Sequence, residues 1–259
     1  MQGIIIAAGM GNRMGLLTRN KPKCLLPIKE KTLLEFAIKG LKYAGCQNII
    51  IITGYKAKYI QQLGYETIYN KNYRKNNILH SFFSALPILN IDTMVSYSDI
   101  YVEKNIYKDL SKKKDDIVLT IDKDWKNYYK NRKMHPVSQA EKVFLDKSNK
   151  IKEIGKNLNL NYKKKCYEFT GLFKLSKNGC KIISKVFRML DSKYKKNQPF
   201  ENSDSWEKAY LTDFFHYIIK NDITKIYPHV ISKGWAEFDT IEDYNRLNTI
   251  KEKQGLISL

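Results

Sequence analysis

A short segment near the N-terminus combines glycines with cationic side chains at a spacing suited to binding phosphate groups. The apolar run Ile4 to Ala8 leads into Gly9 and Gly11, and Arg13 follows two residues later. Glycines let the backbone approach a ligand closely, with its N–H groups directed at phosphate oxygens. Arg13 offers a planar fork of donors, and Lys23 a compact positive charge. The segment therefore predicts a nucleotide phosphate site.

Two familiar phosphate-binding motifs fit this segment poorly. The third glycine of a G-x-G-x-x-G motif is missing, because Met14 takes its place. No acidic residue closes a second strand about 20 residues further on, which counts against a dinucleotide-binding fold. A Walker P-loop is excluded, since no Gly-Lys-Ser/Thr follows the glycines.

The first half of the chain alternates apolar, β-branched runs with stretches of helical spacing, which indicates strands and helices in turn. The expected strands are Gly3 to Ala8, Asn48 to Thr53, Thr67 to Tyr69, Asp92 to Tyr97 and Asp116 to Ile121. The expected helices are Thr32 to Ala44 with Gly45 as its C-cap, a helix from Lys56, and Ile78 to Leu89. Such alternation predicts an α/β, Rossmann-like fold with a mostly parallel sheet flanked by helices.

The second half is less regular and predicts a mixed sheet. Strands are expected at Glu141 to Leu145, Lys150 to Ile154 and Tyr167 to Leu175, some of them antiparallel. Helices are expected at Lys177 to Leu190, Glu207 to Lys220 and Ile241 to Lys253, with a loop from Lys193 to Asp204. Because no stretch reads as an interdomain linker, residues 1–259 are expected to form one domain. The later strands would then form a smaller, antiparallel subregion over the carboxyl edge of the sheet.

Composition excludes several classes of protein. The formal charge is +20, but the lysines are scattered, which predicts a solvated basic surface rather than a nucleic-acid site. A basic field would still favour anionic substrates. No apolar run approaches the roughly 20 residues that span a bilayer, so no membrane association and a cytoplasmic location are expected. The four cysteines show no CxxC spacing and are expected to be reduced thiols.

The N-terminal segment, Ala7-Ala8-Gly9-Met10-Gly11-Asn12-Arg13 with Pro22-Lys23 downstream, resembles the signature of the pyrophosphorylase-like nucleotidyltransferases. These enzymes move a nucleoside monophosphate from a nucleoside triphosphate onto a phosphorylated acceptor. The resemblance implies that Ala8, Gly9 and Gly11 wrap the triphosphate. It also implies that Arg13 and Lys23 are catalytic, because they neutralise charge on the α-phosphate and on the leaving pyrophosphate.

The resemblance extends along nearly the whole chain. Gly54-Tyr55 matches a family turn near the nucleotide base, and Ser98-Asp99 matches the end of a strand where the family places its first metal-binding aspartate. Asp239 matches the second metal ligand. The resemblance therefore implies Mg²⁺ at Asp99 and Asp239, which suits a hard ion bound through carboxylates and phosphate oxygens. Glu242 and Asp243 are expected to be acids of a first helical turn.

Residues 69–81 resemble small cytidylyltransferases, which carry a similar N-x-x-Y…N-N…S pattern. These act on phosphocholine, aminoethylphosphonate or phosphoglutamine-like acceptors. The resemblance implies CTP as substrate, with Asn77 and Ser81 at the nucleotide pocket, and an acceptor that is a small phosphorylated amine or amino acid. Products of this kind would supply surface polysaccharide, capsule or phosphonate biosynthesis. A helix N-cap is an equally good interpretation of Asn77.

The acceptor site is less sharply indicated by the sequence. Its candidate residues are Arg132, Glu141, Glu168, Lys174 and Trp235, with Trp125, Tyr128, Tyr129 and Trp206 as further possible aromatic walls. An acceptor phosphate is already anionic near neutral pH, so no general base is required. The four histidines, His80, His135, His216 and His229, show no metal or triad spacing and are expected to be mostly structural.

Three alternatives remain at this point. The nearest is a sugar-1-phosphate nucleotidyltransferase that uses UTP, dTTP or GTP on the same scaffold. A non-catalytic relative should have lost Arg13, Lys23, Asp99 or Asp239, and all four are present. A nucleic-acid-binding protein would require clustered basic residues. The sequence leaves the oligomeric state open, with a homodimer as one alternative.

Overall fold

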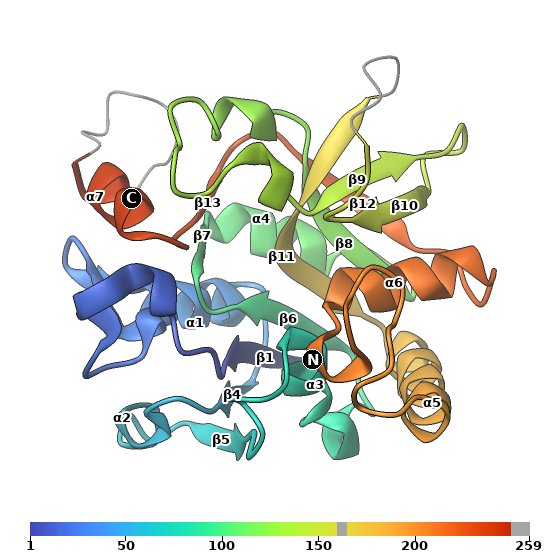
Figure 1. The fold of residues 1–259 in the computed structure, drawn as a ribbon, viewed down its shortest axis with the longest axis horizontal. Coiled ribbons are helices and arrows are strands. Elements are labelled where there is room, and N and C mark those ends of the chain that lie inside the picture. Colours follow the sequence, from blue (N-terminus) through green and yellow to red (C-terminus); the bar gives the residue numbers. More distant parts are fainter. Residues whose placement is uncertain (160–164, 250–259) are drawn as a thin grey trace.

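The computed structural model of the protein describes residues 1–159 and 165–249. The parallel part of a mixed sheet lies at its centre (Figure 1). Its four neighbouring strands run in the order β6 (Thr93–Tyr97), β1 (Gln2–Ala7), β4 (Asn48–Thr53) and β5 (Glu66–Tyr69). All three pairings are parallel, so the carboxyl ends of these strands meet at one edge. The strands expected in this part of the sequence are confirmed.

Antiparallel strands extend this sheet beyond β6. The long strand β11 (Cys166–Leu175) pairs antiparallel with β6, with β8 (Ile117–Asp122) and with β9 (Lys142–Leu145). β10 (Ile151–Gly155) continues antiparallel from β9, while β12 (Tyr227–Ile231) runs parallel to β8. The sheet is therefore mixed and mostly parallel at its centre, as the sequence predicts.

Helices cover both faces of the sheet (Figure 1). One apolar cluster packs α1 (Leu33–Tyr43) and α4 (Lys104–Ser111) against one face. A larger cluster packs α3 (Ile78–Phe83), α5 (Lys177–Lys193) and α6 (Leu211–Lys220) against the other. Burial of these faces supplies most of the free energy that holds the layers together.

Helix α1 shows how local sequence fixes an element. Thr32 and Glu35 form a capping box that satisfies backbone N–H groups at the start of the helix. Gly45, with φ of 91°, follows the end of the helix in a left-handed conformation that favours glycine. A Cβ atom at Gly40 would lie 2.4 Å from the ring of Tyr107, so this glycine permits the close contact between α1 and α4.

Some boundaries differ from those expected. Helix α3 ends at Phe83, and a separate 3₁₀ turn, Leu86–Ile88, contains Pro87, which lacks the N–H that a continuing helix needs. Helix α6 begins at Leu211, because the residues before it form a 3₁₀ turn, Trp206–Lys208. Helix α7 covers Ile241–Thr249, and the end of the expected helix lies outside the described residues.

Several short elements were not expected from the sequence. These are α4, β12 and three very short strands, β2 (Pro27–Ile28), β3 (Lys31–Thr32) and β7 (Ile100–Val102). The helix expected from Lys56 is the five-residue α2 (Ala57–Gln61). The segment from Gly234 to Asp243, which resembles the closing strand and helix of the family, forms β13 (Trp235–Glu237) and the start of α7. Two- and three-residue strands carry too little periodicity to be detected. The pairing of β7 with β13 matters for function, because it brings the segment after Asp99 beside the segment before Asp239.

The four cysteines are buried and form no disulfide, as expected from their spacing. Among the helices in residues 1–159 and 165–249, none combines the length and apolar character needed to cross a membrane.

Candidate active site

A cleft of about 500 Å³ opens at the carboxyl edge of the parallel strands. In the sheet register, Ala7 lies beside Thr53 and Ile6 beside Tyr97, so the loops after β1 and β6 leave the sheet together. Ligand sites of open α/β sheets lie at this edge. The predicted residues that line the cleft are Ala8, Gly9, Gly11, Arg13, Lys23, Asn77, Ser81, Ser98, Asp99, Glu141, Glu168, Trp235 and Asp239.

The glycine loop after β1 forms one wall of this cleft. Gly11 has φ of 64°, and a Cβ atom there would lie 3.1 Å from Cβ of Lys23. Glycine therefore lets the loop turn directly beside Lys23. The hydroxyl of Thr18 donates a 2.9 Å hydrogen bond to the carbonyl of Gly11 and fixes the turn.

Gly54 and Tyr55 do not line the cleft but support this loop from behind. A Cβ atom at Gly54 would lie 2.6 Å from the carbonyl oxygen of Ala8 and equally close to Cβ of Tyr73. The backbone N–H of Tyr55 donates to the same oxygen of Ala8, and its hydroxyl donates to the carbonyl of Arg19 at 2.8 Å. Both residues thus position the glycine loop.

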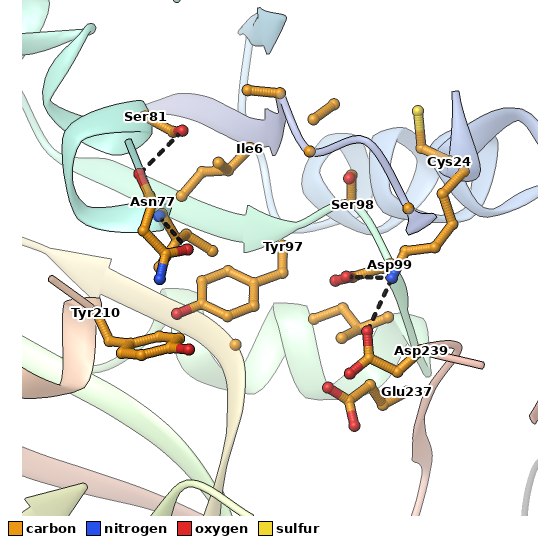
Figure 2. A pocket seen from close by; sticks show the side chains of 18 of the residues that line it. Ile6, Cys24, Asn77, Ser81, Tyr97, Ser98, Asp99, Tyr210, Glu237 and Asp239 are labelled. Atoms are coloured by element: carbon orange, nitrogen blue, oxygen red, sulfur yellow. Dashed lines mark hydrogen bonds and ion pairs between the residues drawn. The ribbon is translucent and has the colours of Figure 1, made fainter. Parts of the chain in front are cut away.

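Four charged side chains converge beside the loop. Lys23 Nζ lies 2.7 Å from Asp99 Oδ2 and 3.0 Å from Asp239 Oδ1, and Arg13 Nη2 lies 2.6 Å from Asp239 Oδ2. Figure 2 shows Asp99 and Asp239 joined by dashed lines to the same nitrogen. Two acids separated by 140 positions along the chain therefore share one ammonium group.

The electrostatics of this group are tightly balanced. Burial alone would lower the pKa of Lys23, but the charges of Asp99 and Asp239 outweigh it and raise that pKa above its usual value. Burial alone would raise the pKa of Asp239, but Lys23, His135 and Arg13 hold it well below the usual range. Both groups are therefore charged near neutral pH.

The two aspartates have the chemistry and placement that a divalent cation requires. An ammonium group already lies between them, which establishes that a cation fits there. Carboxylate oxygens are the ligands preferred by hard ions such as Mg²⁺. The residues therefore fit Mg²⁺, provided that Lys23 moves from the carboxylates onto another anion.

The other end of the cleft holds Asn77, Ser81 and Tyr210, with Tyr97 between the two ends (Figure 2). Asn77 is the N-cap of α3, and its Oδ1 accepts a hydrogen bond from the N–H of Ile78. The helix-cap interpretation of Asn77 is thus correct, and the residue also borders the cleft. Its carbonyl accepts a 3.2 Å bond from the hydroxyl of Ser81.

Two carboxylates, the buried Glu168 and the half-buried Glu141, also line the cleft. Glu168 accepts a 2.5 Å hydrogen bond from the hydroxyl of Tyr129, while its other oxygen has no hydrogen-bond partner among the described residues. Burial, reinforced by the charge of Glu237, raises the pKa of Glu168 well above its usual value. Burial likewise raises the pKa of Glu141 to about 7, with Lys156 opposing the shift. At Glu141 the nearby Lys156 offsets only part of the effect of burial, whereas the charges around Asp239 outweigh it.

Two predicted acceptor residues lie outside this cleft. Lys174 Nζ donates to the carbonyl oxygens of Ser111 and Lys113, which holds it away from the site, so the structure does not support an acceptor role for Lys174. Arg132 is buried and binds Asp243 through two bonds of 2.6 and 2.8 Å. Its guanidinium therefore anchors the segment that carries Asp239 rather than facing a ligand.

The aromatic walls are also fewer than expected. Trp125 and Trp206 are fully buried in the core. Tyr128 stacks on Trp235 at 5.7 Å between ring centroids and so supports it from behind. Of the aromatic residues named from the sequence, Trp235 borders the cleft, and the structure adds Tyr97 and Tyr210.

Other lining residues were missed by sequence reasoning. His135 and Glu237 lie beside Asp239, and Lys156 lies with its Nζ 4.1 Å from the ring centre of Tyr210. Glu237 could have been predicted, because it lies two residues before Asp239 and side chains two apart in an extended chain point to the same face. Nothing in the spacing of His135 or Lys156 indicated a site.

Comparison with known proteins identifies the family of the chain. Residues 3–149, more than half of the chain, match the MobA-like NTP transferase domain. The chain belongs to this family. A curated relative, the CTP:phosphoglutamine cytidylyltransferase of Campylobacter jejuni, is 28% identical over 94% of this chain and 97% of its own length. The choline-phosphate cytidylyltransferase of Streptococcus pneumoniae is 34% identical over 42% of this chain and 48% of its own.

Two solved structures share the fold across nearly the whole chain. A CTP:phosphocholine cytidylyltransferase from Streptococcus pneumoniae superposes with a TM-score of 0.72 at 22% identity, covering 95% of this chain and 97% of the other. An inositol-1-phosphate CTP transferase from T. maritima gives a TM-score of 0.70 at 18% identity, with 100% and 98% covered. These likenesses confirm the predicted nucleotidyltransferase fold.

Proposed function

We propose that this protein is a Mg²⁺-dependent cytidylyltransferase, which transfers CMP from CTP to a small phosphorylated amine or amino acid and releases pyrophosphate. The observation that carries the proposal is the convergence of Lys23, Asp99 and Asp239 beside the glycine loop. The choice of CTP is supported by the names of the relatives, which transfer cytidylyl groups to phosphoglutamine and choline phosphate.

The transfer needs no protein nucleophile. An oxygen of the acceptor phosphate attacks the α-phosphorus of CTP, and the bond from that phosphorus to the bridging oxygen of the β-phosphate breaks. The electron pair leaves with pyrophosphate. The chain aligns the two phosphates and neutralises the developing charge. When bound, Mg²⁺ would be held by Asp99 and Asp239 and would supply positive charge to the triphosphate.

Lys23 and Arg13 change partners in this scheme. Without ligands, both cations rest on the carboxylates that would hold Mg²⁺. When CTP and Mg²⁺ enter together, the side chains are free to move onto phosphate oxygens. Arg13 is suited to this because its side chain is 53% exposed. Binding of nucleotide and of metal should consequently be strongly cooperative.

The acceptor end of the cleft supports a cationic acceptor. A bound ammonium group would favour the ionised forms of Glu168 and Glu141, whose pKa values burial otherwise raises, and it would pair with the free oxygen of Glu168. Tyr97 and Trp235 offer π faces to a cation. Lys156 borders the same space and would pair with a carboxylate if the acceptor carries one. These charges suit a phosphorylated amine or amino acid better than a neutral sugar phosphate.

A substrate panel tests the proposal. Purified protein with Mg²⁺ is given CTP, UTP, dTTP or GTP in turn, with phosphocholine, phosphoglutamine, aminoethylphosphonate or glucose 1-phosphate, and pyrophosphate release is measured. We expect turnover with CTP and an amine-bearing acceptor. Turnover confined to UTP, dTTP or GTP with glucose 1-phosphate would replace the proposal with a sugar nucleotidyltransferase.

A variant tests the acceptor part separately. Glu168→Gln should raise KM for the amine-bearing acceptor about 10- to 100-fold, the usual cost of losing a charge-assisted contact. KM for CTP should stay unchanged. An unchanged KM for the acceptor would remove Glu168 from the acceptor site and leave nucleotidyl transfer intact.

The expected cytoplasmic location, the single domain and the homodimer alternative stay predictions.

A further inference from the structure

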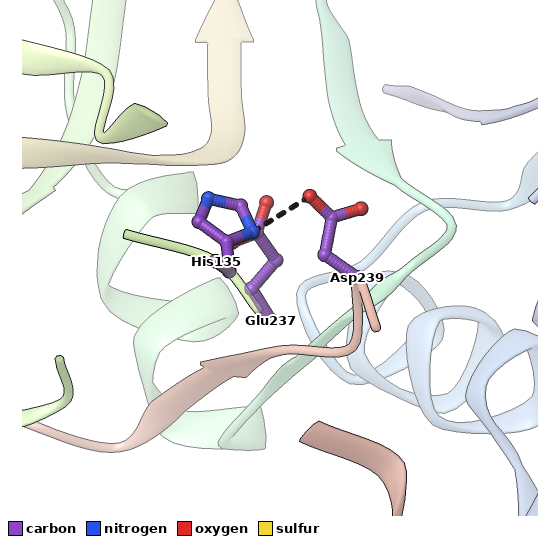
Figure 3. Close-up of side chains that lie close together, drawn as sticks. All are labelled: His135, Glu237 and Asp239. Carbon is purple, nitrogen blue, oxygen red and sulfur yellow. Dashed lines mark ion pairs between the residues drawn. The ribbon is translucent and has the colours of Figure 1, made fainter. Parts of the chain in front are cut away.

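Beside the paired aspartates, three side chains bring potential metal ligands together. His135, Glu237 and Asp239 each offer one ligand atom, and these atoms all lie within 4.8 Å of one another. Figure 3 shows the imidazole of His135 directed at the carboxylate of Asp239, with Glu237 alongside. The spacing of His135 shows no metal or triad pattern, so this grouping is visible only in the folded chain.

The distances within this group match those around a single ion. His135 Nδ1 lies 3.0 Å from Asp239 Oδ2 and 3.7 Å from Glu237 Oε2. Nitrogen and oxygen ligands about 2.0–2.2 Å from a metal are roughly 3.0 Å apart at octahedral angles and 3.4 Å apart at tetrahedral angles. Only small side-chain adjustments would therefore complete the shell.

The state of His135 is a second, independent observation. Its side chain is 4% exposed, and Nδ1 points at Asp239 Oδ2 from 3.0 Å without the geometry of a hydrogen bond among the described residues. A buried polar atom without a partner is costly and uncommon in folded proteins. A bound cation would satisfy that nitrogen.

We propose that His135, Glu237 and Asp239 form a second divalent-cation site, distinct from the one at Asp99 and Asp239, and that this site accepts a transition-metal ion such as Mn²⁺. An imidazole ligand favours first-row transition metals over Mg²⁺, whereas carboxylates accept both. Asp239 belongs to both sites, because Oδ1 faces Lys23 and Oδ2 faces His135.

The position of the second site indicates its role. The ring of His135 packs at 5.9 Å on that of Tyr129, whose hydroxyl binds Glu168 in the cleft. An ion at His135 would thus lie on the acceptor side of Asp239. Two ions bridged by a carboxylate can stabilise the attacking and the leaving oxygens of an in-line displacement.

Two arginines compete for the ligands and set a second test. Arg13 occupies Asp239 Oδ2 at 2.6 Å, but its exposed side chain can leave. Arg132 contacts Glu237 Oε2 at 3.2 Å and is itself fixed by Asp243. Replacing Arg13 with alanine should therefore tighten Mn²⁺ binding at Asp239, and the second site further predicts that the more tightly bound ion has His135 as a ligand.

Pulsed EPR of Mn²⁺ bound to the full chain tests the site directly. Nucleotide and acceptor are left out, so the result is independent of the proposed transfer activity. We expect ¹⁴N coupling from a histidine ligand in the wild type, its loss in His135→Asn, and Mn²⁺ binding at least about 10-fold weaker in that variant. Asp99→Asn and the control His229→Asn, outside the cleft, should retain the coupling.

A second variant is available in case the first does not fold. If circular dichroism shows that His135→Asn does not fold, Glu237→Gln replaces it, with weaker Mn²⁺ binding as the expected result. Absence of ¹⁴N coupling at saturating Mn²⁺ in the wild type would overturn the proposal. So would coupling that persists in a folded His135→Asn protein, or Mn²⁺ affinity that neither Glu237→Gln nor Arg13→Ala changes.

Discussion

Replacing Lys23 with methionine should change turnover and metal binding in opposite directions. Its ammonium lies 2.7 Å from Asp99 and 3.0 Å from Asp239, where the proposed Mg²⁺ would bind. Methionine keeps much of the side-chain length but removes the charge. The variant therefore loses a group that stabilises the transition state, and it also loses an internal competitor of the metal.

The structure allows both effects to be scaled. Removing one preorganised group that stabilises transition-state charge costs about 10²- to 10³-fold in turnover, or roughly 3–4 kcal/mol. For metal binding, a unit charge about 4 Å away contributes roughly 4 kcal/mol at an effective dielectric constant of about 20, and hydration of the freed ammonium offsets most of it. We therefore expect Mg²⁺ to bind the nucleotide-free variant about 10-fold more tightly.

The fold should tolerate this change. Asp239 retains Arg13 at 2.6 Å, and the side chain of Asp99 is 27% exposed to water. Neither carboxylate is thus left buried without a partner, the situation in which loss of a salt bridge is most damaging.

Two measurements decide the outcome. Pyrophosphate release at saturating CTP and acceptor gives turnover, and competition with Mn²⁺ gives the Mg²⁺ affinity without nucleotide. Lys21→Met is the matched control, because Lys21 belongs to the same segment but does not border the cleft. Turnover within about threefold of wild type, or Mg²⁺ affinity that falls together with turnover, would refute the reasoning.

Three further predictions concern the metal, the loop and the buried acids. Asp99→Asn should lower turnover at least about 100-fold without rescue by excess Mg²⁺, and unchanged rates would remove Asp99 from the metal site. Gly54→Ala should lower the melting temperature, because the added Cβ would lie 2.6 Å from the carbonyl oxygen of Ala8. Gly9→Ala has open space around the added Cβ, so it should leave the melting temperature unchanged and raise KM for CTP. Equal melting temperatures for the two alanine variants would contradict this contrast. Burial raises the pKa of Glu141 to about 7, so the folded state keeps a proton that the unfolded chain releases above about pH 4.3. The free energy of unfolding should therefore fall as the pH rises from about 4.3 toward 7. The measurement is the free energy of unfolding in urea at pH 5 and at pH 7.5. It should fall less between these pH values in Glu141→Gln than in the wild type, and an equal fall in both proteins would argue against the raised pKa.

Sequence reasoning succeeded where chemistry and local structure lie close together along the chain. The glycine loop, Arg13 and Lys23 belong to one continuous segment, and Asp99 directly follows a strand that periodicity identifies. The parallel strands were also predictable, because their buried apolar runs are ended by glycine or polar turns. These features needed no knowledge of how remote segments pack.

It failed where the outcome depends on tertiary packing. Lys174 and Glu168 lie on the same ten-residue strand, β11, but six residues of extended chain span roughly 20 Å, so one reaches the cleft and the other does not. Arg132 lies near the site, yet its Nε and Nη2 groups donate to Asp243, which also caps α7. Such partner choices are not encoded in spacing.

The same limitation explains the missed His135. It follows an irregular segment after β8, and only the pairing of β7 with β13 puts Glu237 and Asp239 opposite it. A lone histidine in a loop is more often structural than functional, so the sequence offered no ground for placing His135 in the cleft. The proximity of its Nδ1 to two carboxylates becomes visible only in the folded chain.

The central claim, transfer of CMP to a phosphorylated amine or amino acid, is tested most directly by ³¹P NMR of the complete reaction. CTP, Mg²⁺ and phosphoglutamine or phosphocholine are incubated with the wild type and with the Lys23→Met variant. We predict equimolar pyrophosphate and a new pair of coupled phosphoanhydride signals from the CDP-linked acceptor, formed far more slowly by the variant. Release of CDP and inorganic phosphate, or a new phosphoanhydride that forms only when a sugar 1-phosphate and another nucleotide are supplied, would contradict the claim.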